Sequence, residues 1–297
     1  MLSIIITAFN EPLVEKTIFS ILNQTIEEPY ELIIAAPDKR TKKIVKELSK
    51  THQQLKYFKD PGKGKVFALN QVFKITEGRI LILTDGDLYL GNNSINEIIK
   101  KFENPKVGCV SGRPMAQDDK NTLFGYWAHF LYDIGAHKIS RKKRYETDKF
   151  LECSGYLYAF RNNIISKLPL DVAEDSITPY LFWKKGYKIA YAENSLVYVK
   201  NPTNMHDFIK QRKRAADSHT KLKKYAPDFP KVKTLKNEIL EGLSLEVLKY
   251  PKNPKELIWT LALYPVRLYI WLVLFFDLKF KKKEYQDGWE RSESTKI

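Results

Sequence analysis

The chain has 297 residues, which suits one large domain or a medium domain with an appendage. With 43% hydrophobic and 29% charged residues its composition is that of a folded protein, which excludes global disorder. Two cysteines are too few for a disulfide framework or a zinc site. The net charge of +15 favours an anionic partner, or else a solvated lysine-rich surface. We expect no nucleic-acid partner, because no docking motif or aromatic-interleaved basic segment is present.

Strand and helix patterns alternate through the first half of the chain. Short apolar runs predict strands at Leu2–Thr7, Tyr30–Ala36, Leu55–Phe58 and Arg79–Thr84. Helical spacing predicts helices at Pro12–Gln24, Thr41–Lys50 and Lys65–Thr76. This alternation indicates βαβ crossovers and a mostly parallel sheet flanked by helices. Ligands bind at the carboxyl ends of such strands, where the sequence places Asn10, Glu11, Asp38 and the acidic loop Asp85-Gly86-Asp87.

The second half is less regular. Strands are predicted at Val107–Ser111, Leu157–Phe160 and Lys188–Val199, and helices at Leu123–Lys138 and from about Asp175. We interpret the basic run Arg141–Arg144 as a mobile loop. Beyond Lys221 the pattern predicts an amphipathic helix at Val232–Leu248 and an apolar segment at Leu257–Phe276. That segment contains Arg267 and Pro265, and Lys279 and Lys281–Lys283 follow it.

The acidic loop is the first candidate site. Two carboxylates one residue apart at a strand end, with a glycine between them, can hold Mg²⁺ or Mn²⁺ beside a diphosphate. Such an ion stabilises the negative charge that grows on a diphosphate leaving group. Taken alone, the tripeptide is more typical of a plain turn.

Several motifs in order remove that ambiguity. The segments Ser3–Glu11, Gly62–Asn70 and Leu83–Asp87 resemble the nucleotide-binding half of glycosyltransferase family two. Cys153–Asn162 resembles the acceptor-side glycine segment of that family, Ala173–Asp175 its catalytic acidic motif, and Gln211–Ala215 its Gln-x-x-Arg-Trp motif with Ala215 in place of the tryptophan. The resemblance implies an α/β GT-A fold, which is a Rossmann-like nucleotide half joined to an acceptor half.

The resemblance also implies roles for individual residues. Asp175 is expected to be the catalytic base that takes the proton of the acceptor hydroxyl, in an inverting transfer. Asp85 and Asp87 are expected to hold the metal. The residues expected to contact the nucleotide sugar are Ala8, Asn10, Glu11, Asp38, Lys63, Asp85, Gln211, Arg212 and Arg214. The residues expected on the acceptor side are Cys153, Gly155 and Glu174.

Each of these residues also has a structural interpretation. Asp38 could cap the helix before Thr41, and Glu174 and Asp175 could begin the following helix. Lys63 and Lys65 lie in a glycine-rich loop that could pair with phosphates or form a solvated turn. Cys153 fits a pocket wall better than a nucleophile. The usual acidic pair after the second strand is replaced by Ala36-Pro37, so the sequence names neither the base nor the sugar, and UDP- and GDP-sugars both stay open.

The apolar segment 257–276 approaches the length of a membrane-spanning helix. Arg267 would cost at least about 2.5 kcal/mol in a lipid-exposed span. The nucleotide sugar and the lysines after the segment both favour the cytoplasmic side. We therefore expect a peripheral, monotopic or re-entrant helix on the cytoplasmic face of the cell membrane, with a packed helix or a dimer face as the alternative.

The division expected from these patterns is a catalytic domain over 1–225, with a nucleotide half 1–112 and an acceptor half 113–225, followed by a helical region 226–297. The expected activity is transfer of a sugar from a nucleotide diphosphate to a lipid-linked or membrane-proximal glycan or a polyprenyl phosphate. The alternatives are a processive polysaccharide synthase, a nucleotidyltransferase, and a non-enzymatic basic protein that binds membranes or nucleic acid. The Trp-to-Ala departure at Ala215 weakens the processive alternative.

Overall fold

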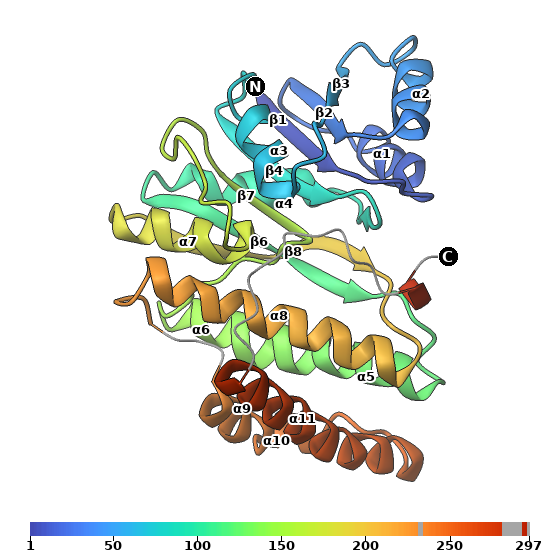
Figure 1. Ribbon diagram of the computed structural model, residues 1–297, viewed down its shortest axis with the longest axis vertical. Coiled ribbons are helices and arrows are strands. Elements are labelled where there is room, and N and C mark those ends of the chain that lie inside the picture. Colours follow the sequence, from blue (N-terminus) through green and yellow to red (C-terminus); the bar gives the residue numbers. More distant parts are fainter. Residues whose placement is uncertain (231–233, 281–292, 296–297) are drawn as a thin grey trace.

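The computed structural model describes residues 1–230, 234–280 and 293–295. Its centre is one eight-stranded sheet with helices on both faces. Three C-terminal helices lie on the far side of α5 (Leu123–Phe130) and α8 (Met205–Tyr225) from that sheet (Figure 1). The strand order is β3-β2-β1-β4-β7-β6-β8-β5. The strands are β1 (Leu2–Thr7), β2 (Tyr30–Ala36), β3 (Leu55–Lys59), β4 (Ile80–Asp85), β5 (Tyr89–Leu90), β6 (Val107–Ala116), β7 (Leu157–Arg161) and β8 (Lys188–Val199).

The first four strands in that order form the parallel half of the sheet, as the alternating pattern predicts. The apolar runs of β1, β2 and β4 are buried on both faces, which is why they read as continuous rather than alternating hydrophobic segments. In this register Thr7 pairs with both Ala35 and Asp85. The ends of β1, β2 and β4 therefore meet at one edge, where the acidic loop begins.

Beyond β4 the sheet is mixed. Strand β7 runs antiparallel to β4, so Leu157 at its start pairs with Thr84 near the end of β4. The Thr84 hydroxyl donates a hydrogen bond to the Tyr156 carbonyl at 2.7 Å. This reversal brings the segment before β7 beside the acidic loop, although the two are about seventy positions apart in the chain.

Helices cover both faces of the sheet. One apolar cluster packs α1 and α4 against one face, and a second cluster packs α3 and α7 against the other. The helices up to this point are α1 (Val14–Leu22), α2 (Lys39–Leu48), α3 (Lys65–Val72), α4 (Ser94–Ile99), the 3-10 turn η1 (Lys100–Glu103) and α7 (Glu174–Lys184).

The segment from Leu123 onward forms one long helical run. It comprises α5 (Leu123–Phe130), the π-helix η2 (Leu131–Lys142) and α6 (Lys143–Glu146). The prediction of a mobile loop at Arg141–Arg144 is therefore wrong. Tertiary packing decides this, because Arg141 is only 7% exposed and Arg144 donates to Ser140 at 2.9 Å one turn earlier.

The C-terminal region is helical, in part as predicted. It contains α8 (Met205–Tyr225), α9 (Leu235–Gly242), α10 (Leu245–Leu248), α11 (Pro254–Phe280) and the short turn η3 (Glu293–Thr295). The single helix predicted at Val232–Leu248 is wrong in part, because the described residues form two helices that break at Leu243-Ser244. The predicted lysines Lys281–Lys283 lie outside the described residues.

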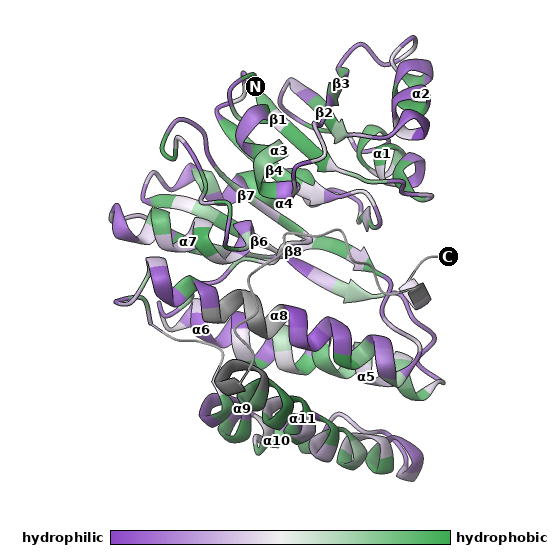
Figure 2. Cartoon of the chain, viewed as in Figure 1, coloured by the Kyte–Doolittle hydropathy of each residue, from purple (hydrophilic) through white to green (hydrophobic). Residues whose placement is uncertain are grey.

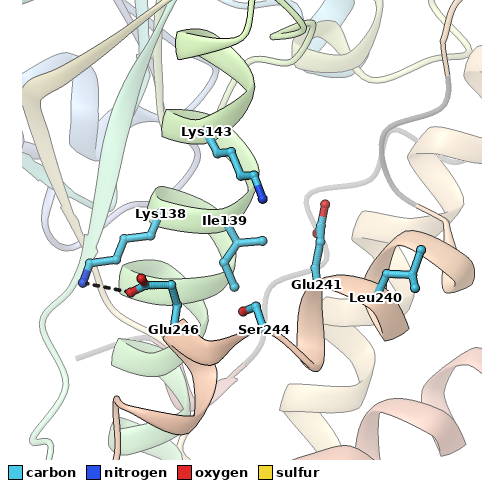
Figure 3. A pocket seen from close by; sticks show the side chains of 7 residues that line it. All are labelled: Lys138, Ile139, Lys143, Leu240, Glu241, Ser244 and Glu246. Carbon is cyan, nitrogen blue, oxygen red and sulfur yellow. Dashed lines mark ion pairs between the residues drawn. The ribbon is translucent and has the colours of Figure 1, made fainter.

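The C-terminal helices dock on α5, η2 and α8. Trp127 donates from Nε1 to the Trp259 carbonyl at 2.7 Å, and Phe208, Leu263 and Ile270 are buried in the same cluster. An ion pair of 3.7 Å between Lys138 and Glu246 connects η2 to α10 (Figure 3). Helix α11 is continuous through Pro265, and hydrophobic residues predominate along it (Figure 2).

Candidate functional site

The acidic loop is held rigidly at the end of β4. The Thr7 hydroxyl donates to Asp85 Oδ1 at 3.0 Å, and the Gly86 amide donates to the Thr7 carbonyl at 3.0 Å. A Cβ at Gly86 would lie 2.9 Å from the Ala8 Cβ, so the loop can rest this close to β1 only with glycine. Ala8 itself has no exposed surface. It therefore supports the loop from beneath.

Lys65 connects two acidic motifs. It is the first residue of α3, and its Nζ lies 2.7 Å from Asp85 Oδ1 and 2.5 Å from Glu174 Oε1. Burial works against its charge, but Asp85 and Glu174 outweigh that effect and raise the pKa of Lys65 well above its usual value. Lys63 instead lies 5.5 Å from the ring of Phe67 and is exposed. Of the two lysines in the loop, Lys65 is thus the one inside the site.

Asp87 is the second carboxylate of the loop. Burial and the charge of Asp85 raise its pKa to about 6, against the opposing charges of Lys65 and Arg214. Two carboxylates that repel each other in a buried position have the donor atoms and the negative potential that a divalent cation requires. The pair therefore fits Mg²⁺ or Mn²⁺.

Asp175 lies in the first turn of α7, and its Oδ2 accepts a hydrogen bond from the Gly155 amide at 3.1 Å. A Cβ at Gly155 would lie 2.9 Å from that oxygen, so this contact needs glycine. Glu174 and Asp175 do begin the helix, and this structural interpretation is compatible with the catalytic one. Cys153 is buried with its Sγ 3.2 Å from that of Cys109, and burial raises the pKa of its thiol well above the usual value. A thiol in that state is a poor nucleophile.

Asp38, Asn10 and Glu11 are among the residues expected to contact the nucleoside. Asp38 caps α2, because it accepts hydrogen bonds from the Thr41 amide at 2.8 Å and the Thr41 hydroxyl at 3.0 Å, and it also accepts one from the Asn10 amide at 3.0 Å. Burial raises its pKa, but these bonds outweigh burial and lower it overall. Asn10 has a left-handed backbone with φ of 48°, and Glu11 is buried and accepts from the Leu13 amide. The helix-capping interpretation of Asp38 is confirmed, and its contact with a nucleoside stays a prediction.

A cavity of about 1400 Å³ joins the acidic motifs to the C-terminal helices. Ten of the candidate residues line it: Asp85, Asp87, Cys153, Gly155, Glu174, Asp175, Gln211, Arg212 and Arg214, together with Lys65. The other five, Ala8, Asn10, Glu11, Asp38 and Lys63, lie outside its wall. The cavity wall also includes residues that the sequence analysis assigned to no site, among them Tyr132, Arg141 and Glu152. No local pattern marks these residues as part of a site. Arg141, for example, belongs to a run that resembles an exposed basic segment.

Arg212 and Arg214, both on α8, line this cavity. Arg214 lines the cavity together with Asp87, and its charge opposes the rise in the pKa of Asp87. Arg212 lies 5.3 Å from the ring of Phe208, and burial together with the charge of Arg267 lowers its pKa. Phe208 belongs to the apolar cluster that α11 completes, so Arg212 packs beside the C-terminal helices. Its contact with the nucleotide sugar stays a prediction.

Comparison with known proteins identifies relatives of this chain. A model of glycosyl transferase family 2 matches residues 3–168, more than half of the chain. Hyaluronan synthase from Streptococcus pyogenes is 27% identical over 103 residues, which are 35% of this chain and 24% of that protein. Beta-monoglucosyldiacylglycerol synthase from Trichormus variabilis is 30% identical over 100 residues, which are 32% of this chain and 21% of that protein. The match thus spans a quarter or less of these relatives.

A solved structure shares the fold. Mannosyltransferase PcManGT from Pyrobaculum calidifontis, in complex with GDP-Man and Mn²⁺, superposes with a TM-score of 0.65 at 20% identity. The superposition covers 95% of this chain and 88% of that one. It confirms the expected GT-A fold.

Proposed function

This chain belongs to glycosyl transferase family 2, and we propose that it transfers a sugar, with inversion, from a nucleotide diphosphate to a membrane-proximal acceptor. The acceptor would be a lipid-linked glycan, another glycan at the membrane, or a polyprenyl phosphate. One observation carries the proposal above all others. Asp85, Asp87 and Asp175 line a single cavity, and Lys65 connects the acidic loop to the start of α7.

The donor would lie against the acidic loop. Asp85 and Asp87 would hold Mg²⁺ or Mn²⁺, and this ion would stabilise the charge on the departing nucleoside diphosphate. Among the residues that the structure describes, no group of three or more His, Cys, Asp or Glu side chains could hold an ion. An ion here would therefore keep water and phosphate ligands, as Mg²⁺ commonly does. Arg214, which lines the same cavity as Asp87, would contact the diphosphate.

Asp175 would act as the base. As the acceptor oxygen forms its bond to C1 of the sugar, Asp175 takes the hydroxyl proton, and the bond from C1 to the diphosphate oxygen breaks with its electron pair on the leaving group. The Gly155 amide orients the carboxylate by donating to Oδ2, and the other oxygen, Oδ1, lies 3.4 Å from the Ser176 hydroxyl.

The apolar face of α11 supports a position at the membrane. Residues Pro254–Phe276 are long and apolar enough to cross a membrane, and only 22% of the most apolar window is buried inside the protein. Arg267 does not oppose membrane contact, because it forms a two-point ion pair with Glu238 at 2.6 and 2.8 Å. We propose that the helix lies on the cytoplasmic face of the membrane, where nucleotide sugars are available.

Two measurements test this proposal. A panel of UDP- and GDP-sugars with Mn²⁺, read by thermal shift, should single out the donor, because a bound donor stabilises the folded state. Asp175→Asn should then reduce transfer by at least about a hundredfold while donor binding stays unchanged, in line with the loss of a general base. Full transfer by Asp175→Asn would overturn the assignment of the base.

A further inference from the structure

Arg141 is buried in the wall of the cavity without a hydrogen bond. It lies near the end of the π-helix η2, and 7% of it is exposed. A guanidinium group has five N–H donors, yet among the described residues none of those of Arg141 has an acceptor, and Nε and Nη1 are fully enclosed. Its one ion pair is long, at 3.7 Å from Nε to Glu152 Oε1, an oxygen that already accepts from the Ser140 hydroxyl at 2.9 Å. A buried cation with unused donors is costly, so its presence calls for an anionic ligand.

Arg212, on α8, lines the same cavity in a similar state. Its Nε is enclosed and has no acceptor among the described residues, and its guanidinium group packs over the ring of Phe208. Burial and Tyr156 raise the pKa of Tyr132, and the charges of Arg212 and Arg141 both oppose that rise. Arg141, Arg212 and Tyr132 all line the cavity.

Two acidic side chains of α9 at this end of the cavity already have partners. Glu238 accepts from Arg267 and from Trp271 Nε1 at 2.8 Å, and Glu241 is paired with Arg144. These pairs compensate the acidic groups of α9 within the wall. Among the described residues that line the cavity, the cationic side chains with enclosed nitrogens that lack a hydrogen-bond acceptor are Arg141 and Arg212.

Apolar residues of α10 and α11 surround the same end of the cavity. Val247, Leu263, Trp271 and Leu274 contribute to its lining. Tyr264 and Leu268 line it too, and they are 40% and 52% exposed among the other exposed apolar residues of α11. The lining is thus continuous with the apolar face of α11, so a ligand could place an anionic group inside and an apolar chain toward the membrane.

We propose that Arg141 and Arg212 form a second anion-binding site in this cavity, which takes the phosphate of an amphiphilic, lipid-linked acceptor. The site is separate from the donor diphosphate site at Asp85, Asp87 and Arg214. It would hold the acceptor headgroup while Asp175, on the wall of the same cavity, acts on the acceptor hydroxyl. This assignment of the acceptor class rests on the proposed transferase function, whereas anion binding by the two arginines can be measured by itself.

The test uses the full chain in detergent, with the donor site saturated by nucleoside diphosphate and Mn²⁺. The probes are farnesyl phosphate, farnesol with the same chain and no phosphate, and inorganic phosphate, each titrated by calorimetry. We expect the wild type to bind farnesyl phosphate at least about tenfold more tightly than either of the other two, the ratio expected from one or more charge-assisted hydrogen bonds. Arg141→Gln should remove most of that preference and leave farnesol binding unchanged.

Two further variants keep the test decisive. Arg141→Lys should retain part of the preference, and Arg212→Gln should reduce it even if Arg141→Gln fails to fold. Arg40→Gln, on the exposed side of α2, is the matched control and should bind like the wild type. Equal affinity of the wild type for farnesyl phosphate and farnesol, or unchanged affinity in both Gln variants, would overturn the proposal. Inorganic phosphate that binds as tightly as farnesyl phosphate would overturn the lipid assignment. Failure to bind any nucleotide with Mn²⁺ would instead count against the proposed transferase.

Discussion

Replacing Lys65 with methionine should destabilise the folded protein, because this lysine balances the repulsion between the carboxylates around it. The Lys65 ammonium lies within 2.7 Å of Asp85 and 2.5 Å of Glu174, and its side chain is 18% exposed. Methionine keeps a stem of similar length but leaves both carboxylates, and Asp87 beside them, without this cation. Breaking a buried ion pair from one side costs about 3–5 kcal/mol. Because this site opens onto a cavity, we expect the lower end, about 3 kcal/mol.

That loss can be read as a shift in the melting temperature. With about 2 cal/mol/K of unfolding entropy per residue, a 297-residue chain should lose roughly 5 °C in Tm. Mn²⁺ should recover more stability in Lys65→Met than in the wild type, because the ion supplies the missing positive charge to the same carboxylates. Differential scanning calorimetry with and without Mn²⁺ measures both effects.

The chain offers a matched control and an internal check. Lys63→Met removes a lysine two positions away that is exposed over Phe67, so it should leave Tm within about 1 °C. Adding Glu174→Gln to Lys65→Met should recover part of the loss, because the uncompensated Glu174 charge is then absent. A Lys65→Met variant that melts with the wild type in metal-free buffer would refute the reasoning.

Three further predictions concern the cavity near Asp175, stability in acid, and contact with the membrane. Gly155→Ala should lower transfer strongly with little change in Tm, since the new Cβ would lie 2.9 Å from Asp175 Oδ2; unchanged kcat would contradict the positioning role of this glycine. Burial raises the pKa of Glu31, but hydrogen bonds from the Glu77 amide, Lys56 and Ser3 lower it overall. The stability that ionised Glu31 contributes is therefore present above its unfolded pKa near 4.5 and is lost as pH falls through its folded pKa. Glu31→Gln should therefore cost about 2 kcal/mol at pH 7, and denaturant unfolding should show that cost shrinking below pH 4.5; a cost independent of pH would be the contrary result. Leu261→Glu with Leu272→Glu, which alters side chains that are 58% and 49% exposed, should abolish flotation with anionic vesicles, whereas the equally exposed Ile75→Glu should float like the wild type.

Several elements follow directly from local patterns. The predicted bounds of β1, β2 and β8 agree with the structure, because β-branched and apolar runs favour extended backbone wherever a sheet can bury them. Short elements were missed. The two-residue strand β5 and the six-residue helix α4 are too brief to show a period, and both are stabilised mainly by contacts with other parts of the chain.

The candidate site was likewise predictable from the sequence only in part. The order of its motifs along the chain predicts Asp85, Asp87 and Asp175 as its acidic residues, and the structure places all three on one cavity. The sequence also offers Lys63 and Lys65 as equals. Only the packing of α3 against β4 and α7 decides that Lys65 connects Asp85 and Glu174.

What the sequence determines by itself is therefore local: the strand runs, the residues at the strand ends, and the order of the family motifs, because each depends on neighbouring positions alone. What the tertiary structure decides is which distant residues meet. The antiparallel entry of β7 brings Gly155 to Asp175, and the packing of α8–α11 on η2 turns an apparently exposed basic run into a buried Arg141. The physical reason is that burial depends on what covers a residue, and its cover here comes from segments up to a hundred positions away.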